Sequence, residues 1–90
     1  MNEALLLKEE RFTTGGLGSH DVNASVYCLF PPYDDALFCR VSTNRQLQET
    51  LVFKCDDEGN VLNWGEIFGM REILPHDEVL IAMGYQVRIP

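Results

Sequence analysis

The sequence has few basic residues, and they are spread singly along the chain. Seven Lys and Arg residues stand against fourteen Asp and Glu residues, which gives a formal net charge of -7. Binding to a nucleic-acid backbone requires clustered Lys and Arg, so the composition excludes nucleic acid as a direct ligand. An acidic surface suits a basic protein partner instead, although a net charge away from zero also simply keeps a small domain soluble.

The sequence also lacks a long apolar run. No stretch approaches the roughly 18–20 apolar residues of a membrane span, so we expect no contact with a membrane. The first ten residues, MNEALLLKEE, lack the basic region and the small-residue cleavage site of a signal peptide. We therefore expect a cytoplasmic protein.

The cysteines and histidines show no metal-binding spacing. Zinc sites usually contain close-set pairs such as CxxC, whereas the candidate ligands here are far apart: His20, Cys28, Cys39, Cys55 and His76. An odd number of widely spaced cysteines favours a reducing compartment and free, buried thiols. We expect no cofactor, and a metal or catalytic site built from these residues is the least favoured alternative.

No catalytic motif is present either. Ser19, His20 and Asp21 are adjacent, and adjacent residues cannot form a catalytic triad because nucleophile, base and orienting acid converge from separate elements. The preceding TTGGLG segment joins two predicted strands and no lysine follows it, which favours a connecting loop over a phosphate-binding loop. We expect a protein without enzymatic activity.

Length and composition predict one domain, residues 1–90. The hydrophobic fraction of 46% is sufficient for a core. Alternating apolar residues predict strands over 4–12, 22–30, 36–41 and 85–89, and helical spacing predicts a helix over 75–83 with Asp77 and Glu78 near its start. The expected fold is α+β: a mainly antiparallel sheet of four to six strands built from hairpins, with one short C-terminal helix.

The first predicted hairpin turns at PPYDD, residues 31–35. We chose the register that gathers apolar residues on one face. On that face it forms the pairs Phe30–Leu37, Cys28–Cys39 and Val26–Val41. On the other face it forms the pairs Tyr27–Arg40, which can stack as cation and ring, and Leu29–Phe38.

The second predicted hairpin, ETLVFKCDDEGNVLNWGE from Glu49 to Glu66, is the clearest element of the sequence. A loop over residues 56–59 pairs Phe53 with Leu62 and Leu51 with Trp64, and Gly59 can take the positive φ that such a turn requires. The predicted core face of this hairpin comprises Leu51, Phe53, Cys55, Leu62 and Trp64.

The same segment resembles a pattern in small uncharacterised proteins of phages and mobile elements. The matching positions are Glu49, Thr50, Leu51, Val52, Phe53, Cys55, Asp56, Gly59, Val61, Trp64 and Glu66. The resemblance covers this hairpin alone and implies a phage-type source rather than an activity. Small acidic phage proteins are often inhibitors of host proteins, anti-CRISPR proteins among them, so the resemblance also implies action in the host cell cytoplasm.

Carboxylates cluster at the predicted turns and at the start of the helix. General acid–base catalysis requires carboxylates held in a cleft, whereas turn residues are solvated and often serve solubility alone. The functional alternative is an acidic contact surface, which forms if the two hairpins bring their tips to the same edge of the sheet. The candidate partner-binding residues are then Tyr33, Asp34, Asp35, Asp56, Asp57 and Glu58.

Two functional hypotheses follow from these patterns. The first is a phage-type binding protein that inhibits a host defence or nucleic-acid-handling protein by occupying its basic surface, as anti-CRISPR proteins do. The second is a small structural or assembly protein that acts as a homodimer or pairs through an exposed strand edge.

Overall fold

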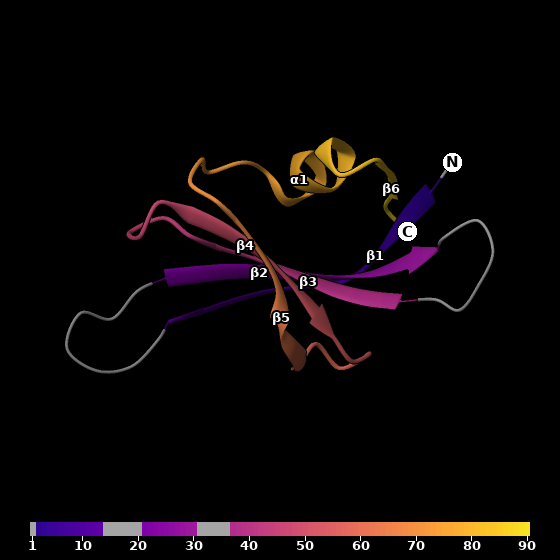
Figure 1. Cartoon of the computed structure of the whole chain (residues 1–90), viewed down its shortest axis with the longest axis horizontal. Coiled ribbons are helices and arrows are strands. Elements are labelled where there is room, and N and C mark those ends of the chain that lie inside the picture. The colour runs from indigo at the N-terminus through magenta and orange to yellow at the C-terminus, as the bar shows by residue number, and fades with distance from the viewer. Residues whose placement is uncertain (1, 14–20, 31–36) are drawn as a thin grey trace.

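Six strands and one helix make up the fold (Figure 1). This computed structural model describes residues 2–13, 21–30 and 37–90, and for residues 63–68 it describes the backbone alone. In chain order the elements are β1 (Asn2–Thr13), β2 (Asp21–Phe30), β3 (Leu37–Asn44), β4 (Glu49–Cys55), β5 (Val61–Met70), α1 (His76–Ala82) and β6 (Tyr85–Arg88).

The strands form one mixed sheet in the order β5-β4-β3-β2-β1-β6. Strands β1 to β5 are antiparallel to their neighbours, as successive hairpins require, whereas β6 is parallel to β1. The segment between β5 and β6 crosses one face of the sheet and contains α1 (Figure 1), which is the kind of crossover that a parallel strand needs. The α+β class predicted from the sequence is therefore confirmed, with a sheet that is not purely antiparallel.

Helix α1 forms where local signals predict it. It follows Pro75, carries Asp77 and Glu78 in its first turn, and is followed by Gly84 with a φ of 96°. A helix of seven residues is marginal alone, so the burial of Val79 and Leu80 against the sheet stabilises it. No helix in the described ranges is long and apolar enough to cross a membrane.

The register of the first hairpin differs by one residue from the prediction, because Tyr27 lies opposite Cys39. A shift of one residue moves the side chains of one strand to the other face relative to its partner. The predicted pairs are therefore wrong: Phe30–Leu37, Cys28–Cys39, Val26–Val41, Tyr27–Arg40 and Leu29–Phe38. The prediction assumed a single buried face, whereas both faces of this sheet are buried at its centre.

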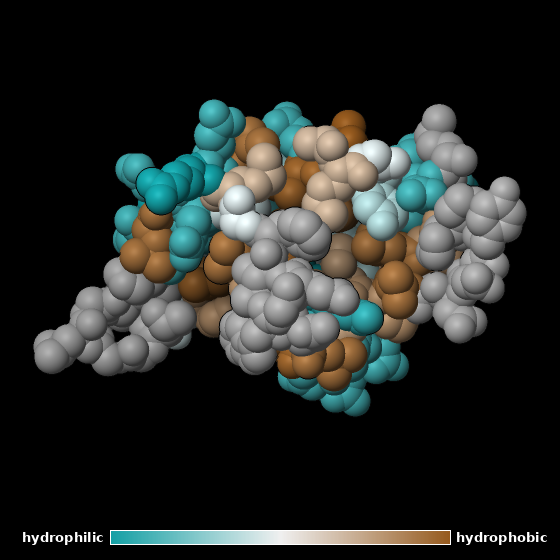
Figure 2. Space-filling view, in the orientation of Figure 1, coloured by the Kyte–Doolittle hydropathy of each residue, from teal (hydrophilic) through white to brown (hydrophobic). Residues whose placement is uncertain are grey.

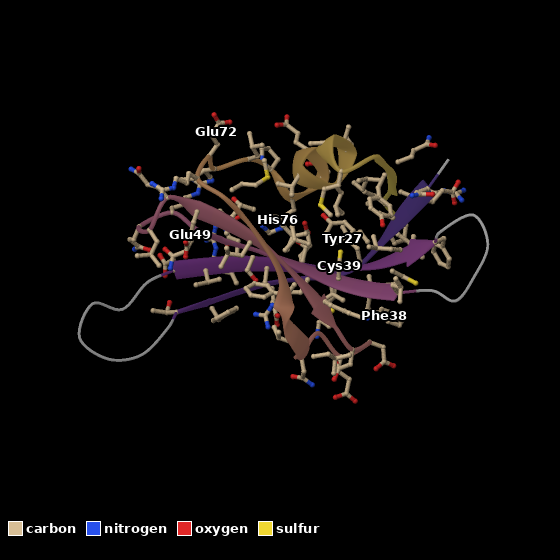
Figure 3. All side chains as sticks on the ribbon, in the orientation of Figure 1. Tyr27, Phe38, Cys39, Glu49, Glu72 and His76 are labelled. Carbon is tan, nitrogen blue, oxygen red and sulfur yellow. The ribbon has the colours of Figure 1, made fainter. Side chains whose placement is uncertain are left out.

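One face lies under α1, and we call it the helix face. Its core comprises Ala4, Tyr27, Leu29, Cys39, Val41, Val52, Val79 and Leu80. By strand alternation the opposite face carries Val22, Ala24, Val26, Cys28, Phe53 and Cys55, which are also buried. Figure 3 shows this division: Tyr27 and Cys39 lie on the side of α1, and Phe38 lies on the other side.

The second hairpin forms as predicted but in another register. Lys54 lies opposite Asn63, and the register shifts on both sides of Lys54, so the predicted pairs Phe53–Leu62 and Leu51–Trp64 are wrong. Phe53 is buried as expected, whereas Leu62 is 60% exposed. Such irregularities increase local twist, and β5 crosses β1 and β2 steeply in Figure 1. The predicted core position of the Trp64 side chain lies outside the described residues.

Candidate functional site

The connection between β4 and β5, which we call the acidic turn (residues 56–60), is closed by Asp56. Its Oδ1 accepts hydrogen bonds from the backbone N–H groups of Glu58 and Asn60, both at 2.9 Å, and its Oδ2 accepts one from Asn60 Nδ2 at 3.1 Å. These bonds, first of all the one from the Asn60 backbone, lower the pKa of the Asp56 carboxyl group. Asp56 therefore shapes the turn, because its acceptors are used within it.

Two basic side chains from other strands hold the backbone of the acidic turn. Lys8 Nζ on β1 donates a hydrogen bond to the carbonyl oxygen of Glu58 at 2.7 Å, and Arg40 Nη1 on β3 donates one to the carbonyl oxygen of Gly59 at 3.2 Å. Gly59 has a φ of 93°, and a Cβ atom there would lie 2.9 Å from Cγ2 of Val26. The turn thus folds back onto the face opposite α1, where glycine alone fits without strain.

Arg40 also connects the acidic turn to β1. Its Nη2 lies 3.5 Å from Oε1 of Glu10, and its guanidinium carbon lies 5.4 Å from the centroid of the Phe12 ring. The cation–ring contact therefore involves Phe12 rather than Tyr27, because the true register places Tyr27 on the helix face. The guanidinium group of Arg40 therefore contacts the acidic turn, Glu10 and the Phe12 ring at the same time.

Two acidic side chains of the anchored turn are exposed to solvent. Asp57 and Glu58 are exposed, and the lower end of the molecule in Figure 2 shows hydrophilic residues beside a hydrophobic patch. The end of β4 and the start of β3 share one edge, because Phe38 lies opposite Cys55. The other predicted contact residues lie outside the described residues, and their approach to this edge stays a prediction: Tyr33, Asp34 and Asp35.

A second polar cluster lies between α1 and the sheet (Figure 3). Nδ1 of His76 is 2.7 Å from Oγ of Ser25, and Nε2 is 3.0 Å from Oγ1 of Thr43. Thr43 Oγ1 is in turn 3.1 Å from Oγ1 of Thr50, which donates a hydrogen bond to the carbonyl oxygen of Glu72 at 3.4 Å. The start of α1 is thereby tied to three strands.

The order of these bonds determines which nitrogen of His76 carries the proton. Thr50 gives its hydroxyl proton to a carbonyl, so it accepts from Thr43, and Thr43 then accepts from His76. Nε2 of His76 is therefore the donor. Nδ1 of the neutral ring is an acceptor, and the Ser25 hydroxyl donates to it.

Burial keeps the His76 ring neutral. It lowers the pKa of His76, while the nearby carboxylates of Glu9 and Asp77 act in the opposite direction. Within the described ranges both ring nitrogens are bonded to hydroxyl groups and not to a carboxylate, and Ser25 is only 3% exposed. The cluster therefore lacks the orienting acid and the accessible nucleophile of a serine-hydrolase triad.

Sequence reasoning considered His76 only as a metal ligand and missed this cluster. The available signal was strand alternation: Ser25 falls on the same side of its strand as Tyr27 and Leu29, and Thr43 falls on the same side as Cys39 and Val41. Strand alternation places both on the helix face with Tyr27. Burial raises the pKa of Tyr27 to about 12.

The cysteines are structural. All three are free and buried, and burial raises the pKa of Cys39 to about 12 and that of Cys55 to about 11. Cys28 and Cys39 lie on opposite faces, so they are not the cross-strand neighbours that the predicted register made them. In the described part of the chain, no group of three or more His, Cys, Asp or Glu residues is arranged to hold a metal ion.

Comparison of the chain with protein families, with curated proteins and with solved structures gives no match. The acidic turn and the His76 cluster are therefore interpreted from their own geometry. The first presents charge to solvent on an anchored backbone, and the second holds secondary structure together.

Proposed function

We propose that this chain is a non-enzymatic, phage-type protein that binds a host protein through the acidic turn and inhibits it, as anti-CRISPR proteins do. The target is a defence or nucleic-acid-handling protein with a basic surface, and the encounter takes place in the host cell cytoplasm. Asp57 and Glu58 make the contact, with Tyr33, Asp34 and Asp35 as neighbouring contacts. The observation that carries the proposal is that the turn backbone is held at Glu58 and Gly59 while two carboxylates point to solvent.

Anchoring matters because disorder opposes binding. A loop that is already held in one conformation loses less conformational entropy when a partner docks. Exposed carboxylates then attract a basic surface and orient the encounter, an effect that salt weakens. The net charge of -7 extends the same attraction over a longer range.

Three basic residues are paired within the chain. Lys8 and Arg40 are directed to backbone carbonyl groups of the turn, and Arg40 and Arg88 also pair with Glu10 and Glu3. These three bases are therefore paired within the chain and do not join into the extended positive surface that a nucleic acid requires. A basic protein partner therefore fits the charge distribution better than a nucleic acid does.

The proposal is tested by capture followed by an activity assay. The tagged protein is incubated with a bacterial lysate at low and at high salt, the captured protein is identified, and its purified form is assayed with and without the chain. We expect a captured defence or nucleic-acid-handling protein whose activity falls and whose capture is lost at high salt. Capture that is independent of salt, or a target whose activity is unchanged, would count against the proposal.

One observation favours the assembly alternative. Strand β5 spans ten residues at an edge of the sheet, and no strand in the described residues pairs with its outer side. Exposed edges of this length recruit a further strand, from a second copy or from a partner. Size-exclusion chromatography with light scattering distinguishes the two functions, since a tight homodimer that neither captures nor inhibits a host protein would favour assembly.

A further inference from the structure

A polar hollow of about 600 Å³ lies on the helix face beside the segment that leads into α1. Its floor contains the His76 cluster, and Leu74 and Pro75 form an apolar wall. A neighbouring hollow of about 420 Å³ shares three lining residues with it: Arg11, Asn23 and Arg45. The two hollows therefore form one site with the arginines where they meet.

The two arginines come from distant parts of the chain. Arg11 lies on β1 and Arg45 lies directly after β3, and neither forms an ion pair with a described acid. Nε of Arg11 donates a hydrogen bond to Oδ1 of Asn23 at 3.1 Å, which orients the guanidinium group. Among the described residues, two guanidinium groups that form no ion pair therefore meet at one hollow, in a chain with a net charge of -7.

The acids near the arginines make the charge of the site uneven. Glu10 is paired with Arg40, whereas Asp21, which lines the smaller hollow, keeps its negative charge while its carboxylate accepts a hydrogen bond from Thr13 at 2.9 Å. Glu9 lines the larger hollow, faces His76 and has no ion-pair partner among the described residues. An anion is therefore favoured where the two hollows meet, beside the arginines, and disfavoured beside Asp21 and Glu9, where a hydrogen-bond donor fits.

We propose that this hollow binds a small phosphate monoester. The doubly charged phosphate is held by Arg11 and Arg45, because guanidinium groups bind phosphate oxygens through paired hydrogen bonds. The organic body packs on Leu74 and Pro75 and directs a donor group towards Glu9. The volume falls within the range of small-molecule sites. The site lies mainly on the helix face, whereas the acidic turn packs on the opposite face.

The test is a calorimetric titration of the intact protein with adenosine 5′-monophosphate, adenosine and inorganic phosphate. We expect the monophosphate to bind, and both fragments to bind about tenfold more weakly or worse. Arg45→Gln and Arg11→Gln should each weaken binding by about 10- to 100-fold. Arg71→Gln, which removes the same charge from an exposed arginine that lines neither hollow, should leave the affinity unchanged.

Several results would overturn the proposal. One is no heat from any probe at millimolar concentration, and another is equal binding by Arg45→Gln and the unchanged protein. An equal loss in Arg71→Gln would show a general charge effect rather than a site. If inorganic phosphate binds as tightly as the monophosphate, the apolar wall and Glu9 contribute nothing to binding, which contradicts the proposal of a monoester site. Circular dichroism of each variant checks that the fold is retained, which is expected because all three arginines lie at the surface.

Discussion

Nζ of Lys8 lies 2.7 Å from the carbonyl oxygen of Glu58, fifty residues further along the chain. The bond joins the middle of β1 to the tip of the β4–β5 hairpin. Together with the bond from Arg40 to Gly59 it fastens the acidic turn to the face opposite α1. The exposed carboxylates at residues 57 and 58 are therefore carried by a backbone that the sheet itself positions.

Lys8→Met should loosen the acidic turn. The substitution keeps much of the apolar stem and removes the ammonium group, so the carbonyl of Glu58 loses its donor. We expect a loss of about 0.5–1.5 kcal/mol in the free energy of unfolding. Hydrogen exchange at the Gly59 amide should become faster, because that amide closes the turn by donating to the Asp56 carbonyl at 3.0 Å. Lys8→Arg retains a donor and serves as the control, and equal exchange in both variants would contradict the anchoring role.

Gly59→Ala should destabilise the protein more than Gly84→Ala. Both glycines have positive φ, 93° and 96°, so each substitution has the backbone cost of about 1–3 kcal/mol. At Gly59 the new Cβ would also lie 2.9 Å from Val26, whereas at Gly84 nothing lies within 4 Å. Urea unfolding of the two variants measures the difference, and the double variant Gly59→Ala with Val26→Ala should lose less stability than the sum of the two single losses. Equal losses would show that the turn does not pack on Val26.

His76 should make the protein less stable in mild acid. Its pKa is lower in the folded protein than the ordinary value of 6.5, so the unfolded chain binds more protons near that pH. The contribution is fully present above about pH 6.5 and is lost as the pH falls from there through the folded-state value. Unfolding by urea at about pH 7.5 and about pH 5.5 measures it.

The matched variants for that measurement are His76→Ala and His20→Gln. His76→Ala should cost about 1–3 kcal/mol at neutral pH, because Ser25 and Thr43 lose a buried partner. It should also reduce the pH dependence, whereas His20→Gln should retain it. If the pH dependence of stability survives in His76→Ala and disappears in His20→Gln, then His20 and not His76 causes it, and the prediction is wrong.

Cys39 should resist thiol reagents in the folded protein. Burial raises its pKa to about 12, so almost none of it is the reactive thiolate at neutral pH. Iodoacetamide labelling followed by mass spectrometry should find Cys39 modified only after unfolding in denaturant. Rapid labelling of native Cys39 would show that the helix face opens more easily than its packing implies.

Local features of the fold could be predicted from the sequence. The helix over 75–83 was indicated by Asp77, Glu78 and Gly84, and it forms at His76–Ala82. Positive φ at Gly59 was likewise expected and is observed. These features depend on a few neighbouring residues, whose preferences the sequence shows directly.

The registers could not be predicted in the same way. Val26 and Val41 are both fully buried, yet they lie on opposite faces, so a rule that gathers apolar residues on one face selects the wrong pairing. The parallel pairing of β6 with β1 joins the two ends of the chain, and no local pattern specifies it.

The candidate site was predictable only in part. The acidic residues were visible in the sequence, but their division into one that closes the turn and two that face solvent depends on the hydrogen bonds of Asp56. The pairing of His76 with Ser25 spans 51 positions and depends on how α1 crosses the sheet.

The most direct test of the central claim measures the affinity of the captured host protein for two doubly substituted variants. Asp57→Asn with Glu58→Gln removes the exposed carboxylates of the acidic turn, and Glu72→Gln with Glu78→Gln removes the same charge from exposed acids elsewhere. We predict that the first pair weakens binding at low salt by about two- to thirtyfold, since exposed charge pairs contribute about 0.2–1 kcal/mol each, and that the second pair does not. Equal affinity of the two variants would contradict the claim that the acidic turn is the contact surface.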